Sequence, residues 1–133
     1  MPDLIRDNNL KVTKALPAAG ATNYSASIDL RAGTPGVTQD DAQLEVAIPA
    51  LPSLADAKTA TVTVQDSADD STFADVPALA PVVLTGVSTS GAAAVTRLFP
   101  LPKDLRRFVR VKQVVQSAGG DNTAKSSVTS LVY

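Results

Sequence analysis

Polar and apolar residues alternate most regularly over residues 59–65. In this stretch, TATVTVQ, threonines and a glutamine take the odd positions, and an alanine and two valines take the even ones. An extended chain places successive side chains on opposite faces, so the pattern predicts a half-buried β-strand. Aspartates and serines crowd residues 66–71 and favour a turn, because short polar side chains hydrogen-bond to nearby backbone. Apolar character resumes at Phe73 and Val76, so we expect a β-hairpin over residues 59–76.

The same alternation recurs elsewhere in the chain. The second clear strand lies within residues 105–116, where three valines share one face and Arg110 and Lys112 share the other. We expect a sheet to bury the valines and to leave the cations in solvent. Weaker alternation and short apolar runs predict further strands at residues 10–16, 24–30, 44–48, 82–84, 94–98 and 127–132.

These segments make about eight short strands separated by turn residues, and no stretch sustains the 3.6-residue period of a helix. The pattern favours an antiparallel β-sandwich, in particular a jelly roll. We therefore expect an all-β, single-domain protein with an N-terminal arm at residues 1–9 and a sandwich at residues 10–133. Within the arm, Leu4 and Ile5 are apolar anchors among polar residues and are the candidate partner-binding residues.

Length and composition sharpen the expected core. A chain of 133 residues fits one domain. Its hydrophobic content of 44% comes mainly from Ala, Val and Leu, while aromatic residues make up only 4%. We expect a thin aliphatic core, which two facing sheets can enclose and which association with other chains would stabilise further.

Charge argues against two classes of partner. The 12 basic and 13 acidic side chains give a net charge of −1, so no overall field attracts a polyanion or an anionic membrane. No apolar stretch approaches the roughly 18 residues that a membrane span needs, and the first ten residues lack the apolar run of an export signal. We expect a soluble, unexported protein that binds neither nucleic acid nor membrane.

The residue types also limit the chemistry. The chain has no histidine and no cysteine, which excludes a Ser-His-Asp triad, a Cys-His pair and the usual zinc sites. Lys125 and Ser126 are adjacent in a predicted loop, which is no sign of a desolvated base and nucleophile. The sequence therefore predicts a protein that is not an enzyme, with no catalytic, cofactor-binding or metal-binding residues and no small-molecule substrate.

An acidic cluster is the strongest candidate for a metal site, and its members are Asp66, Asp69, Asp70 and Asp75. A calcium-binding EF-hand loop starting at Asp66 would need a glycine at Ser71 and a glutamate at Pro77. The motif therefore fails, and we interpret the cluster as a solvated hairpin turn. A looser calcium site in the turn at Asp66–Asp70 stays open.

A basic strip follows the hairpin, with the members Lys103, Arg106, Arg107, Arg110 and Lys112. Phe108 is the only aromatic beside them, and strand alternation divides the cations between two faces, which disfavours a nucleic-acid site. We interpret the strip as a solvated rim that could meet an acidic protein surface.

The hairpin and the basic strand together resemble a known family. VTVQDSADDSTFADV followed by LPKDLRRFVRVK is similar to small phage capsid cement, or decoration, proteins of the family typified by the Bordetella-phage cement protein. The resemblance covers residues 59–112 and implies a jelly-roll homotrimer on the outside of a phage head, made in the host cytoplasm. Its implied role is to bridge neighbouring major capsid proteins and stabilise the shell. The family offers no motif for contact residues, so none is carried over.

A second resemblance keeps an alternative open. Ser67, Asp69 and Phe73, followed by the strand at residues 107–110, resemble the S-x-D turn, aromatic and R-F-V-R pattern of discoidin-like carbohydrate-binding modules. The chain has no tryptophan and few aromatics to stack on sugar, which weakens this reading. Another structural virion protein is the remaining alternative.

Overall fold

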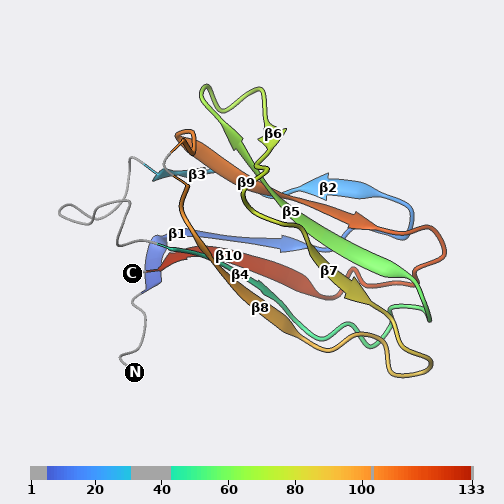
Figure 1. Cartoon of the computed structure of the whole chain (residues 1–133). Coiled ribbons are helices and arrows are strands. Elements are labelled where there is room, and N and C mark those ends of the chain that lie inside the picture. Colours follow the sequence, from blue (N-terminus) through green and yellow to red (C-terminus); the bar gives the residue numbers. More distant parts are fainter. Residues whose placement is uncertain (1–5, 31–42, 103, 133) are drawn as a thin grey trace.

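The structure is a computed structural model that describes residues 6–30, 43–102 and 104–132. These residues form ten β-strands and no α-helix, so the described part of the chain has no helix able to cross a membrane. The strands are β1 (Arg6–Ala15), β2 (Thr22–Tyr24), β3 (Ile28–Asp29), β4 (Gln43–Ile48), β5 (Thr59–Ser67), β6 (Ala74–Asp75), β7 (Val82–Thr85), β8 (Val95–Pro100), β9 (Phe108–Val115) and β10 (Ser126–Val132) (Figure 1).

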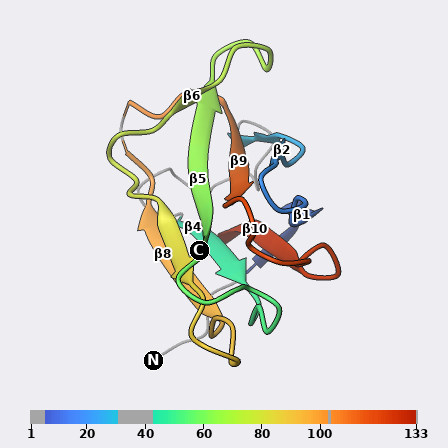
Figure 2. The same cartoon turned by 90° about the vertical axis from the view of Figure 1, so that its right-hand side faces the viewer.

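The strands form two antiparallel sheets that face each other (Figure 1; Figure 2). The first sheet, called sheet A here, has the order β1-β10-β4-β8. The second, sheet B, has β9 and β5 at its centre. Both β2 and β3 pair with β9 on one side, and both β6 and β7 pair with β5 on the other. Each of these two edges of sheet B is thus one interrupted strand.

The pairing is that of a long hairpin rolled up on itself. The first strand pairs with the last, β1 with β10, and the interrupted β2/β3 pairs with β9. Further in, β4 pairs with β8, and β5 pairs with the interrupted β6/β7. This nesting is the topology of a jelly roll. The prediction of an all-β antiparallel sandwich is confirmed.

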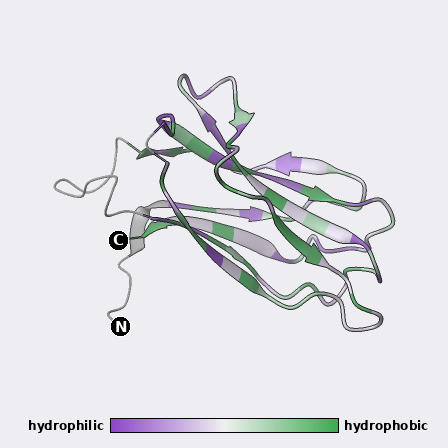
Figure 3. Cartoon of the chain, in the orientation of Figure 1, coloured by the Kyte–Doolittle hydropathy of each residue, from purple (hydrophilic) through white to green (hydrophobic). Residues whose placement is uncertain are grey.

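The core lies between the sheets and is aliphatic, as predicted. Its buried hydrophobic side chains are those of Leu, Ile, Val and Ala alone, among the described residues. Val62 and Val64 of β5 meet Leu44 and Val46 of β4 in one cluster. Along β5 and β9, hydrophobic and polar bands alternate as the pleat requires (Figure 3).

One part of the sandwich interior is polar and centres on Gln113 of β9, which is fully buried. Its amide nitrogen donates to the Ala15 carbonyl at 3.0 Å and to Asn23 Oδ1 at 2.8 Å. Its amide oxygen accepts a hydrogen bond from the Ser127 hydroxyl. Because both ends of the amide have partners, burial costs little, and Gln113 ties β9 to both strands of the β1–β10 pair.

Thr129 of β10 is also buried, but its hydroxyl has no hydrogen-bond partner among the residues that the structure describes. We expect Thr129→Val to raise the free energy of unfolding by about 1 kcal/mol, because valine keeps the shape and removes an unsatisfied polar group. Ser127→Ala is the matched control and should lower it by about 1–2 kcal/mol, since it leaves the Gln113 oxygen without its donor. Chemical denaturation measures both changes, and a loss of stability in the Thr129 variant would contradict this account.

Two strands differ from their predictions. The strand expected at residues 24–30 is broken into β2 and β3, because Ser25 bonds β9 with its side chain as well as its backbone. The Ser25 N–H donates to the Val111 carbonyl at 2.9 Å, and its Oγ accepts from the Val111 N–H at 3.0 Å. The first strand begins at Arg6, so residues 6–9, which we expected in the arm, belong to β1, with an irregular register between Arg6 and Lys11.

The loops at one end of the sandwich are joined by backbone hydrogen bonds. They lie at the right in Figure 1 and connect β4 to β5, β7 to β8 and β9 to β10. Leu51 and Ala92 exchange two hydrogen bonds of 2.8 and 2.9 Å. The Ala55 N–H donates to the Gly119 carbonyl at 3.1 Å. Backbone hydrogen bonding therefore continues beyond the ends of the strands into these loops.

Candidate functional site

The residues singled out from the sequence fall into two groups. Leu4, Ile5 and Lys103 lie outside the described residues. The acidic cluster and the remaining basic residues gather at and beside the β5–β6 hairpin, on sheet B. Within the described ranges, no group of three or more acidic side chains is placed to hold a metal ion.

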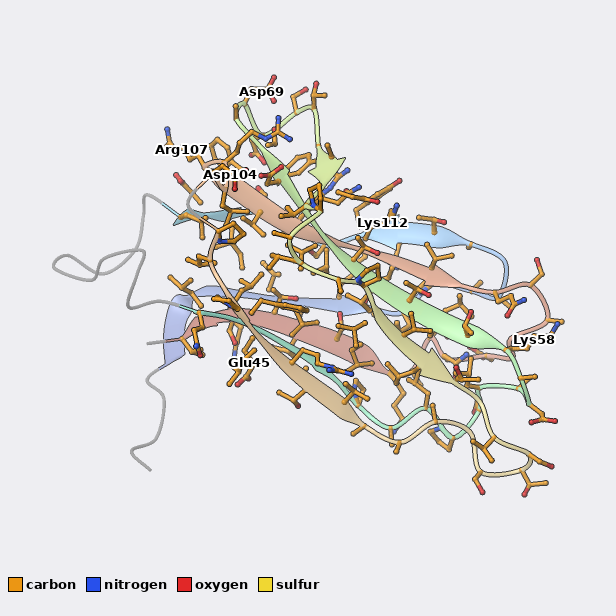
Figure 4. All side chains as sticks on the ribbon, viewed as in Figure 1. Glu45, Lys58, Asp69, Asp104, Arg107 and Lys112 are labelled. Carbon is orange, nitrogen blue, oxygen red and sulfur yellow. The ribbon has the colours of Figure 1, made fainter. Side chains whose placement is uncertain are left out.

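Asp69 lies at the tip of the β5–β6 hairpin and shapes its turn (Figure 4). Its carboxylate accepts hydrogen bonds from the backbone N–H groups of Ser71 and Thr72, both at 3.0 Å, and from the Ser67 hydroxyl at 2.8 Å. These bonds favour the ionised form and lower the pKa of Asp69 from 3.8 to about 2, the Thr72 N–H having the largest effect. The carboxylate is thus engaged in the turn that the sequence predicted.

The lowered pKa of Asp69 predicts a pH dependence of stability. The pKa is lower in the folded state, so ionised Asp69 stabilises the fold above about pH 3.8, and this contribution disappears as the pH falls through about 2. Asp69→Asn is therefore expected to flatten the loss of stability between about pH 4 and pH 2. Denaturation curves across this range measure the slope. Carbon-13 titration of Ser67→Ala should show the pKa of Asp69 raised towards 3.8, and an unchanged value would contradict the assignment.

Asp66 was predicted to lie in the solvated turn, and this prediction is wrong. It belongs to β5, and its residue is only 8% exposed. Its position shares the inward parity of Val62 and Val64, so its side chain lies on the inner face of sheet B. There it accepts hydrogen bonds from Arg106: Nη2 at 2.7 Å, Nε at 3.0 Å and the backbone N–H at 3.1 Å. The pair fastens the β8–β9 connection to β5.

The guanidinium of Arg110 lies between two aromatic rings on the outer face of sheet B. Its Cζ atom is 4.1 Å from the centre of the Tyr24 ring and 4.0 Å from the centre of the Phe73 ring. Tyr24 comes from β2, Arg110 from β9, and Phe73 from the β5–β6 turn. Alternation correctly predicted that Arg110 lies on the face opposite the buried valines, but the prediction that it lies free in solvent is wrong, because this cation is half-buried against two aromatic rings.

Polar side chains continue this arrangement across the sheet. Gln65 accepts a hydrogen bond from Arg110 Nε at 3.0 Å and donates one to Asp75 at 2.8 Å. The Asp75 carboxylate lies 3.4 Å from the Lys112 amine. The Gln65 amide has the largest effect in lowering the pKa of Asp75. We call this surface group the Arg110 cluster, and its members are Tyr24, Gln65, Phe73, Asp75, Arg110 and Lys112.

The Arg110 cluster combines side chains that are typical of protein interfaces. Tyrosine, phenylalanine and arginine are enriched where proteins bind one another, and Tyr24 is 44% exposed. The chain has few aromatic residues, and two of them lie in this one surface cluster, whereas none of the fully buried core residues in the described ranges is aromatic. The arrangement can offer hydrogen-bond donors and aromatic surface to a partner.

Comparisons with known proteins bear on the fold and on the family of the chain. The fold resembles that of the crystal structure of PBSX exported protein XepA, with a TM-score of 0.51 and 12% sequence identity. The alignment covers 95% of this chain and 38% of XepA. The fold of this chain is therefore similar to that of one part of XepA. None of the curated proteins matches the chain in sequence. The model of the Bbp16 family matches residues 12–129.

The chain belongs to the Bbp16 family. This family is of the Bordetella-phage type, and the chain is therefore a phage-related structural protein. The resemblance seen in the sequence implied this much. The family region runs from β1 to β10 and includes every member of the Arg110 cluster.

Sequence reasoning missed two features of this Bbp16-family surface. Tyr24 was assigned only to a strand, because its approach to Arg110 depends on the pairing of Tyr24 with Lys112 across β2 and β9. The Arg106–Asp66 pair was missed because it joins a loop to a strand far along the chain. The parity of Asp66 with the buried valines was the available signal for it.

Proposed function

We propose that the chain is a non-enzymatic capsid cement protein that binds the outside of a phage head as a trimer and stabilises the shell by bridging major capsid proteins. The match to the Bbp16 family over residues 12–129 carries the proposal. The backbone hydrogen bonds that join the loops at one end of the jelly roll support it as well, because a protein that bridges two subunits must keep its own shape.

The stabilising effect would come from several contacts made at once. A trimer that touches several capsid subunits releases only when all its contacts open together, so weak individual contacts add up to firm attachment. The thin aliphatic core, without a buried aromatic among the described residues, is consistent with a chain that gains further stability by association. The capsid surface of the virion is the expected location, after synthesis in the host cytoplasm.

Two measurements test the proposed function directly. Light scattering of the purified protein should give the mass of a trimer. When the protein is mixed with empty heads that lack it, we expect the protein to sediment with the heads. The bound amount should reach a reproducible maximum as more protein is added. A monomer that stays in the supernatant would contradict the proposal.

The N-terminal residues give a separate prediction. We expect deletion of residues 1–8 to weaken binding to heads, because Leu4 and Ile5 are apolar anchors that can reach a neighbouring subunit. Part of the deleted segment, from Arg6, belongs to β1, so thermal unfolding must be measured beside occupancy. The double variant Leu4→Ser, Ile5→Ser leaves β1 intact and serves as the sharper test. Unchanged occupancy of this variant would contradict a role for the two residues.

The carbohydrate-binding alternative gains little from the Arg110 cluster. Sugars stack on exposed aromatic faces, but Tyr24 and Phe73 each already have one face against the Arg110 guanidinium. A glycan array tests the alternative, and strong sugar binding without association with heads would reverse the order of the two proposals.

A further inference from the structure

Arg110 differs from its neighbouring cations because its hydrogen-bond partner is an amide and not a carboxylate. Among the described residues, Arg106 pairs with Asp66 at 2.7 Å, Arg107 with Asp29 at 2.8 Å, and Lys112 with Asp75 at 3.4 Å. Arg110 instead has a neutral partner, the amide oxygen of Gln65, for its Nε–H. Its charge is therefore met by aromatic rings and by an amide, with no carboxylate among the described residues.

The guanidinium of Arg110 is also held in place before any partner arrives. The centres of the Tyr24 and Phe73 rings lie 4.1 and 4.0 Å from its Cζ atom, and its Nε–H donates to the Gln65 amide oxygen at 3.0 Å, so three side chains restrain it. The two terminal nitrogens, Nη1 and Nη2, donate to no acceptor in the described part of the chain, and the residue is only half-buried. A fixed planar fork with free donors loses little conformational entropy on binding, and its geometry matches a carboxylate.

Charge around the fork selects the class of ligand. Asp75 belongs to the same cluster, and Asp69 and Asp70 lie at the tip of the hairpin that carries Phe73. Asp75 is already paired with Lys112 at 3.4 Å, so among the described residues Arg110 is the one cation of the cluster without a carboxylate partner, whereas an extended polyanion such as nucleic acid or an anionic membrane needs many cations together. A single carboxylate that approaches Arg110 in the plane of its fork meets the donors without requiring a wider positive field.

We propose that Arg110, held between Tyr24 and Phe73, binds a carboxylate side chain of the capsid protein, so that the Arg110 cluster is a contact surface of the cement protein with the shell. This inference rests on the proposed function and adds to it the surface and the partner chemistry. Tyr24 contributes both the stack and exposed aromatic area at the rim of the contact.

The test compares three variants in sedimentation with empty heads. Arg110→Gln removes the charge and the fork, and Arg110→Lys keeps the charge but not the planar fork. Arg97→Gln removes the same charge from an exposed position on β8, in the other sheet. We expect both Arg110 variants to weaken binding by about tenfold per contact, the loss of one charge-assisted bidentate pair, and Arg97→Gln to leave it unchanged.

Thermal unfolding and light scattering on the same samples separate the outcomes. A purely structural role would lower the unfolding temperature of the Arg110 variants while their head binding stayed equal to that of Arg97→Gln, and this result would overturn the inference. Loss of the trimer in the Arg110 variants would place the fork between copies of the chain and would overturn it as well. Wild-type protein that fails to bind heads would overturn the proposed function together with this inference, whereas wild-type binding with intact Arg110→Gln binding would overturn the inference alone.

Discussion

Gly91→Ala is expected to cost the fold about 3 kcal/mol, among the largest effects of any single methyl group in this protein. Gly91 has a φ of +69°, and a Cβ atom there would lie 2.0 Å from the Leu51 carbonyl oxygen and 2.6 Å from the Pro52 Cα. The backbone must therefore move. Movement would break the two hydrogen bonds between Leu51 and Ala92 and displace Leu51, which is fully buried in the core.

Gly20→Ala is the matched control for this substitution. Gly20 has a φ of +78°, but the nearest atom to its added Cβ would be the Ser117 hydroxyl, 3.1 Å away, in a side chain that can turn aside. Only the cost of the left-handed backbone remains, about 1 kcal/mol. Chemical denaturation of both variants measures the difference, and equal losses would contradict the close loop packing described at this end of the sandwich.

Arg106→Ala is expected to lower the free energy of unfolding by about 2 kcal/mol. It removes three side-chain hydrogen bonds to Asp66, two to the carboxylate and one to the carbonyl, and leaves the carboxylate with only the Arg106 backbone N–H. A buried charge that loses its partner is costly, and only 12% of the Asp66 side chain is exposed. The β8–β9 connection should also exchange its amide hydrogens faster.

Arg107→Ala provides the comparison, because both arginine side chains are 41% exposed and both donate to an aspartate carboxylate through Nε and Nη2. The carboxylate of Asp29 is more exposed, at 28%, so removing Arg107 should cost less than about 1 kcal/mol. If the two variants lost stability equally, burial of the Asp66 carboxylate would not be the cause.

The strands and the core could be predicted from the sequence because they depend on local alternation. A period of two fixes which side chains face inward, and Val62, Val64, Val109 and Val111 are all buried as the pattern requires. One failure occurs where a side chain takes over a backbone role. Ser25 breaks the second predicted strand in this way, and no propensity of the residue itself reports that Val111 will be its partner.

The Arg110 cluster could be predicted only in part for a related reason. The hairpin and the basic strand were both recognised, and the β5–β9 register that places Gln65 opposite Arg110 brings them together. Their meeting with Tyr24 depends on a third strand, β2, whose position is set by the jelly-roll topology. Alternation predicts which face a cation occupies, but it does not predict what lies above that face.

Cement function makes one demand beyond binding, which is that the shell becomes harder to break. A protein that binds the intact shell better than its separated subunits must stabilise the shell. We expect empty heads saturated with the wild-type protein to withstand higher temperature than bare heads, with the gain scaling with occupancy. The decisive measurement is the disruption temperature of the heads, followed by light scattering, with and without bound protein. A clear rise is the predicted result, and full occupancy with an unchanged disruption temperature would contradict the proposal.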